Sequence, residues 1–225
     1  MRFCLRVDLD YVPWDSPDAA EFGHGEPAMI LRLLELAKEH EYRLQFFASN
    51  RVLHAFPSTA EAILNDGHDL DWLCKHPEQF AARYESAIPL FAILGHKPIG
   101  LAIKTTWPQE GPSEIPGDFK FLSAQGGVSP RAVRLFTTLP KTDRDSARSG
   151  LSADKWTTTV KNELRAASSV NRSTTLTVRP QVLAKLDPHL GHIQEIIRFA
   201  NAFFLPLGTL RDELNERPAG AWTSE

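Results

Sequence analysis

The stretch FCLRVDLDY (residues 3–11) decides how the rest of the chain is interpreted. Residues 2–9 are typical of a buried strand, and this strand ends in two aspartates, Asp8 and Asp10. Side chains two residues apart in a strand point to the same face, so we expect the two carboxylates to lie side by side. Like charges held close together raise the pKa of one partner unless a cation or a proton lies between them. The pair therefore predicts either a metal or proton-handling site, or a solvated strand end.

The composition is that of an ordinary globular protein and argues against several kinds of partner. The chain has 225 residues, of which 42% are hydrophobic and 24% charged, with a net charge of −3. This length suits one large α/β domain spanning residues 1–225. A nucleic-acid partner is not expected, because the sequence shows no basic excess. No apolar run approaches the roughly 20 residues of a membrane span, so no membrane partner is expected.

The amino-terminal residues and the cysteines predict a cytoplasmic protein. MRFCLRVDLD carries charges where the apolar region of a signal peptide would lie. Cys4 and Cys74 are the two cysteines, and their small number fits a reduced protein with two buried thiols.

Strand and helix patterns alternate along the chain. We expect strands at 2–9, 43–48, 68–73, 99–103 and 174–180, with short strand candidates at 119–122, 133–138 and 203–207. Helices are expected at 26–40, at 59–66 with Ser58 as the cap, from Pro77 with an interruption or kink near Pro89, at 152–168, at 188–202 and from about Thr209. The stretch 105–150 is rich in Gly, Pro, Ser and Thr, and we interpret it as an irregular, loop-rich excursion whose most mobile part is 141–150. Repeated βα units predict a mostly parallel sheet or a barrel with outer helices.

The charged residues fall where such folds place their sites, at the carboxyl ends of strands. Asp10 and His76 have the side chains that a catalytic divalent metal prefers, and Asp8 could take a proton from metal-bound water. By spacing alone this pattern is weak. A plain junction between loop and helix explains His76-Pro77 better than a metal site does.

The order of the segments resembles the polysaccharide deacetylase family of carbohydrate esterases. The resemblance is carried by VDLDY (7–11), LQFFASNRVLHAFP (44–57) and AILNDGHDLDWLCKHPEQF (62–80). It implies a distorted (β/α) barrel of about seven strands and a metal-dependent hydrolase acting on an N-acylated carbohydrate. By this resemblance Asp10 and His76 would hold a divalent metal, zinc by expectation, and Asp8 would be the catalytic base.

The sequence also departs from the family pattern. The family has two metal-binding histidines four residues apart, and the partner of His76 falls on Trp72 or Leu73. Ala102 lies about where the family has an arginine, with Lys104 nearby. Arg179 replaces the histidine that serves as the general acid. An arginine cannot donate a proton to a leaving group at neutral pH, but it could bind an oxyanion or pair with Asp8.

Several other residues are candidates for the missing roles. Asp71, Cys74, His68 or His24 could complete a metal site, although each also has an ordinary explanation as a capping, core or solvated residue. Aromatic residues at strand ends could stack on sugar rings, or could pack in the core or at its rim; they are Tyr11, Trp14, Trp72 and Trp107.

Two functions therefore remain open. One is a metal-dependent deacetylase-like hydrolase in which Asp8, Asp10 and His76 act as above. The other is a catalytically inactive relative that keeps the barrel and binds a carbohydrate or a protein partner.

Overall fold

The computed structural model describes residues 2–10, 26–107, 115, 118–127, 130, 133–140, 142–169, 173–203 and 205–216. Within this part of the chain, seven strands form one sheet in the order β6-β5-β4-β3-β2-β1-β7, and every pair of neighbours is parallel. The strands are β1 (Phe3–Leu9), β2 (Gln45–Ala48), β3 (Asp69–Leu73), β4 (Gly100–Ala102), β5 (Phe121–Ala124), β6 (Arg134–Thr137) and β7 (Thr174–Val178).

The sheet curves until its two edges nearly meet. A parallel bridge joins Thr138, just after β6, to Thr175 of β7, and the Leu139 amide donates to the Thr175 carbonyl oxygen at 2.7 Å. The result is the distorted (β/α) barrel of about seven strands that the sequence predicted.

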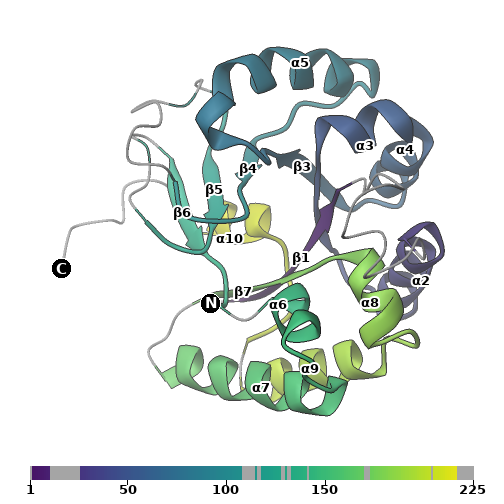
Figure 1. Cartoon of the computed structure of the whole chain (residues 1–225), viewed down its shortest axis with the longest axis vertical. Coiled ribbons are helices and arrows are strands. Elements are labelled where there is room, and N and C mark those ends of the chain that lie inside the picture. The colour runs from purple at the N-terminus through teal and green to yellow at the C-terminus, as the bar shows by residue number, and fades with distance from the viewer. Residues whose placement is uncertain are drawn as a thin grey trace.

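Helices surround the strands (Figure 1). They are α2 (Glu26–Glu39), α3 (Asn50–Ala55), α4 (Pro57–Asn65), α5 (Phe80–Ile93), α6 (Asp143–Arg148), α7 (Ala153–Ser169), α8 (Pro180–Leu186), α9 (Gly191–Ala202) and α10 (Leu210–Glu216), with a 3-10 turn at Pro77–Gln79 before α5. Among the described helices, none is long and apolar enough to span a bilayer.

Alternation along each strand separates two cores. The odd-numbered residues of β1, such as Phe3 and Val7, pack outward against the helices. A smaller apolar cluster fills the inside of the barrel, with Cys4, Phe47, Leu73, Ala102, Phe121, Phe136 and Leu210. Leu210 belongs to α10, whose ion pairs reach the first residues of strands, so this helix covers the amino-terminal end of the barrel.

The stretch 105–150 is more regular than the sequence indicated. Its candidate strands become β5 and β6, which are integral members of the barrel rather than parts of an excursion. The segment expected to be most mobile contains α6. Thr142 starts this helix with a capping box, because its hydroxyl accepts from the Asp145 amide while the Asp145 carboxylate accepts from the Thr142 amide.

Other boundaries also differ from the prediction. Helix α8 was not expected, and α4 begins at Pro57 after Phe56 rather than at the predicted cap Ser58. Helix α5 continues through Pro89, where a kink was expected. The short strand predicted near residues 203–207 is represented by one bridge between Phe3 and Leu207.

Candidate functional site at the carboxyl ends of the strands

The even-numbered residues of β1 place a line of charges inside the barrel. Arg6 and Asp8 are almost completely buried, with 1% and 0% of their surfaces exposed, and Asp10 follows the strand end at 4%. The predicted common face of Asp8 and Asp10 is thus confirmed. Arg6 shares this face, as the spacing of two residues requires, although no role was predicted for it.

Asp8 is held by Arg6 in a two-point ion pair. Arg6 Nε donates to Asp8 Oδ1 at 2.7 Å, and Arg6 Nη2 donates to Oδ2 at 3.0 Å. The guanidinium also donates to the carbonyl oxygens of Ser123 and Ile103, which anchors it across the barrel. Both carboxylate oxygens of Asp8 already have a cationic partner. The role of Asp8 as a base stays a prediction.

Two lysines from later strand ends neutralise Asp10. Lys104 Nζ donates to Asp10 Oδ2 at 2.6 Å, and Lys75 Nζ lies 2.9 Å from Oδ1. Burial alone would raise the pKa of Asp10, but the charges of Lys104 and Lys75 outweigh it and lower the pKa. Burial lowers the pKa of Lys104, an effect that Asp10 opposes. Lys75 follows β3 and Lys104 follows β4, so parallel strands bring both lysines to the edge where Asp10 lies.

Arg179, which follows β7, pairs with Asp143 at the start of α6. Its backbone amide donates to Asp143 Oδ2 at 2.6 Å, and its Nη1 donates to Oδ1 at 3.0 Å. Asp143 is completely buried, and burial raises its pKa to about 6 in spite of this arginine. Of the two alternatives for Arg179, pairing with Asp8 is not observed, because Arg179 pairs with Asp143 and Asp8 pairs with Arg6. The other alternative, binding of an oxyanion by Arg179, stays a prediction. Asp143 was not a predicted site residue, because it lies in the stretch interpreted as mobile.

The side chains around Asp10 do not fit a divalent metal. Both of its oxygens lie within 3 Å of an ammonium nitrogen. His76 is half-exposed, and its Nδ1 lies 3.1 Å from Glu78 Oε1. Among the described residues, no group of three or more His, Cys, Asp or Glu side chains could hold a metal ion. His24 lies outside the described residues. The assignment of Asp10 and His76 as ligands of zinc stays a prediction.

The other candidate ligands have structural partners. Asp71 pairs with Arg211 at the opposite, amino-terminal end of the barrel. His68 precedes β3, is buried against Phe46, and accepts from the Leu44 amide through Nδ1 at 3.4 Å. Cys74 is buried, and burial raises the pKa of its thiol to about 11.

Two of the four candidate aromatic residues, Trp72 and Trp107, belong to the outer core. Trp72 is 1% exposed, packs against Phe80 and Phe119, and donates from Nε1 to Asn50 Oδ1 at 2.7 Å. Trp107 is 9% exposed and packs edge-on against Phe80. Their burial is what the alternative of core packing describes. A role of Trp72 and Trp107 in binding a sugar stays a prediction. Tyr11 and Trp14 lie outside the described residues.

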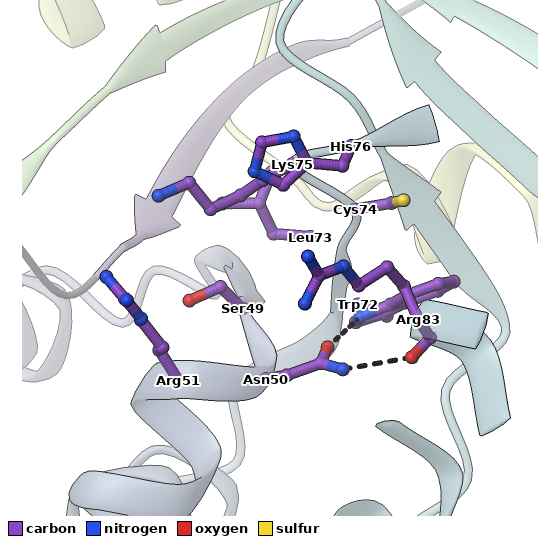
Figure 2. A pocket seen from close by; sticks show the side chains of 9 residues that line it. All are labelled: Ser49, Asn50, Arg51, Trp72, Leu73, Cys74, Lys75, His76 and Arg83. Carbon is purple, nitrogen blue, oxygen red and sulfur yellow. Dashed lines mark hydrogen bonds between the residues drawn. The ribbon is translucent and has the colours of Figure 1, made fainter. Parts of the chain in front are cut away.

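A pocket of about 180 Å³ opens beside Lys75. It lies between the end of β2, the end of β3 and the first turns of α5 (Figure 2). Its lining residues are Ser49, Asn50, Arg51, Trp72, Leu73, Cys74, Lys75, His76 and Arg83. The pocket thus meets the charge cluster at Lys75, which lines the pocket and pairs with Asp10.

Comparison with solved structures identifies the architecture. The Puue allantoinase structure superposes with a TM-score of 0.75 at 13% identity, covering 96% of this chain and 89% of that one. A protein from Mycobacterium smegmatis assigned as a polysaccharide deacetylase gives a TM-score of 0.71 at 15% identity, with 100% and 94% covered. The chain has the fold of the polysaccharide deacetylases.

A catalytically deficient protein also shares this polysaccharide deacetylase fold. A CE4 family pseudoenzyme from Bacillus anthracis superposes with a TM-score of 0.56 at 10% identity, covering 97% of this chain and 66% of that one. No protein-family model matches the sequence, and no curated protein matches it significantly. The resemblance inferred from the motifs is thus confirmed in three dimensions.

Proposed function

We propose that this chain is a carbohydrate-binding relative of the polysaccharide deacetylases whose strand-end site holds its ligand without a metal. The observation that carries the proposal is the environment of Asp10, where the ammonium groups of Lys75 and Lys104 lie 2.9 and 2.6 Å from the two carboxylate oxygens. A divalent cation at Asp10 would have to displace both ammonium groups or sit against their repulsion.

The same cluster has donors for the oxygens of a sugar. An ammonium group has three N–H donors, and Asp10 accepts one from Lys104. Arg179 Nε is buried and has no hydrogen-bond partner among the described residues. A buried donor left unpaired costs about 1–3 kcal/mol, so a ligand oxygen that reaches it is favoured. Three groups of ion pairs at this end of the barrel contain four cations and three carboxylates, so one positive charge is in excess. They are Asp8 with Arg6, Asp10 with Lys75 and Lys104, and Asp143 with Arg179.

A second candidate function is the metal-dependent hydrolysis of an N-acylated carbohydrate. It is favoured by the positions of Asp10 and His76 after β1 and β3, at the edge where parallel α/β folds place their sites. In that case Asp10 and His76 would contribute to holding a metal that activates water, and Asp8 would be the base. Lys75 and Lys104 would first have to leave Asp10.

Metal analysis and ligand binding separate the two functions. We expect protein purified without added metal to contain far less than one equivalent of zinc, and Zn²⁺, Co²⁺ or Ni²⁺ not to raise its melting temperature. A ligand that binds only the native state must stabilise it. Tetra-N-acetylchitotetraose should bind measurably by calorimetry, with no acetate released during incubation.

Variants of two lysines give the controls. Lys104→Met should weaken the binding of this oligosaccharide at least tenfold, whereas Lys97→Met should not, because Lys97 is exposed and pairs with Asp118 away from the cluster. Stoichiometric metal that disappears in Asp10→Asn, together with acetate release, would establish the hydrolase instead. If neither metal nor oligosaccharide binds, the hydrolase and the binding of a neutral oligosaccharide are both refuted.

A further inference from the structure

The pocket beside Lys75 is cationic. Its nine lining residues include Arg51, Lys75, Arg83 and His76 but no aspartate or glutamate. Glu78 touches the rim through its contact with His76, at 3.1 Å. The charge balance of this pocket is thus opposite to that of a metal site and favours a negatively charged guest.

Two arginines of the pocket are not neutralised by a described carboxylate. No described residue pairs with Arg51, which is exposed on α3. Arg83 donates from Nη2 to Gln79 Oε1 at 2.9 Å, a neutral acceptor. Figure 2 shows the Arg83 guanidinium on one side of the pocket, with Arg51 and the Lys75 ammonium on the other. A planar guanidinium binds a carboxylate or a phosphate through two parallel hydrogen bonds, and both arginines remain available for this.

A buried hydroxyl is directed into the same space. Ser49 is 2% exposed, yet its Oγ has no hydrogen-bond partner among the described residues. It occupies the N-cap position of α3, where its side chain makes no capping bond. In Figure 2 the hydroxyl is directed toward the space between Arg51 and Lys75. Leaving such a group unpaired costs free energy, which a ligand oxygen would recover.

We propose that this pocket binds an oxyanion group, a carboxylate or a phosphate, carried by a sugar-sized ligand. Arg51 and Arg83 would grip the oxyanion from two sides, the Ser49 hydroxyl would donate to it, and Lys75 would link it to the charge cluster. A volume of about 180 Å³ suits one such group with part of its sugar ring. The inference rests on the proposed function because it takes the ligand at this end of the barrel to be a carbohydrate, and it adds that the ligand carries an oxyanion.

Calorimetry at low salt with three monosaccharides tests the inference. D-glucuronate carries a carboxylate, D-glucose 6-phosphate carries a phosphate, and D-glucose is the neutral reference. We expect at least one of the two anions to bind at least tenfold more tightly than glucose, and the difference to shrink as salt is added. The anion preferred identifies the source of the oxyanion. Two anions that bind no better than glucose would overturn the proposal.

Variants show whether the binding occurs in this pocket. Arg51→Met and Arg83→Met should each weaken anion binding about tenfold or more. Arg198→Met, an exposed arginine on α9, should leave it unchanged. Ser49→Ala should weaken binding severalfold without lowering the melting temperature, because its hydroxyl makes no bond to the described protein. Anion binding that survives both pocket variants would place the site elsewhere and refute the inference.

The outcome is separable from that of the proposed function. If tetra-N-acetylchitotetraose binds in a manner that depends on Lys104 while the anions do not bind, the oxyanion pocket is refuted and the carbohydrate-binding function stands. If the anions bind through Arg51 and Arg83 while the neutral oligosaccharide does not, the pocket stands and the neutral ligand is refuted.

Discussion

Arg6 and Asp8, two residues apart on β1, neutralise each other inside the barrel through two hydrogen bonds of 2.7 and 3.0 Å. Neither side chain is more than 1% exposed. The pairing explains how a carboxylate remains completely buried beside the apolar cluster inside the barrel. It also means that a residue of the same strand, Arg6, occupies both carboxylate oxygens of Asp8.

The first prediction concerns this pair. Asp8→Asn leaves the Arg6 guanidinium buried without its counter-charge, and Arg6→Met leaves Asp8 in the same state. Each variant should lower the free energy of unfolding by about 3–5 kcal/mol, as expected for breaking a buried ion pair. The double variant Arg6→Met/Asp8→Leu should lose less than the sum of the two single losses.

Chemical denaturation of the three variants measures this coupling. Additive losses would show that the two side chains act independently and would contradict the ion pair. A near-neutral Asp8→Asn would mean that Arg6 finds another partner in the barrel.

The second prediction is a pH dependence that arises from Asp143. Burial raises the pKa of this carboxyl to about 6 in the folded chain, whereas its ordinary value is 3.8. Between these two values the folded state binds more protons at this group than the unfolded state does. Stability from this group is therefore present below about pH 4 and is lost as the pH rises through about 6.

Comparison with Asp143→Asn isolates the effect of this single group. The unfolding free energy of the wild type minus that of the variant should decrease from pH 4 to pH 6 and level off above. Denaturant titrations at several pH values measure it. A difference that increases over this interval would show that Arg179 lowers the pKa of Asp143 more than burial raises it.

The third prediction concerns the end of the barrel opposite the candidate site. Arg211 of α10 donates from Nη2 to Asp71 Oδ1 at 2.6 Å and from Nε to Oδ2 at 3.1 Å, and Asp71 is completely buried. Arg211→Ala should lower the unfolding free energy by roughly 2–4 kcal/mol, slightly less than for a fully buried pair because the arginine is partly exposed.

A neighbouring arginine provides the control for Arg211. Arg43 pairs with Asp69 and Asp212, but half of its side chain is exposed. Arg43→Ala should cost clearly less than Arg211→Ala, because the Arg43 side chain is half-exposed and its ion pairs are weakened by water. Equal losses at the two positions would contradict a specific attachment of α10 through Asp71.

The fourth prediction tests the packing inside the barrel at Gly100. A Cβ atom at this position of β4 would overlap the Phe121 ring and lie 2.7 Å from Asp71 Oδ2. Gly100→Ala should therefore lower stability by about 1–3 kcal/mol, the usual cost of overpacking. Gly191→Ala at the start of α9 should have no such effect, because an added Cβ meets no atom within 4 Å. Thermal unfolding compares the two variants.

Much of the fold could be predicted from the sequence because it depends on local patterns. The run of β1 shows its alternation directly, and the helical periodicity of 26–40 appears as α2. The stretch 105–150 was predicted to be an irregular excursion because its strands are short and it contains many turn-forming residues. β5 and β6 are stable only through pairing with β4 and with each other, and that pairing is a tertiary contact.

The sequence by itself determined that two carboxylates lie on one face at the end of the first strand, since a period of two leaves no alternative. The same spacing of two residues places Arg6 on the face of Asp8, where the two side chains pair. Only the tertiary structure decided that Lys104 neutralises Asp10 and that Arg179 pairs with Asp143. Lys104 is 94 residues from Asp10, and Asp143 is 36 residues from Arg179. Closure of a parallel barrel brings the carboxyl ends of all its strands to one edge, and no local pattern records which distant side chains meet there.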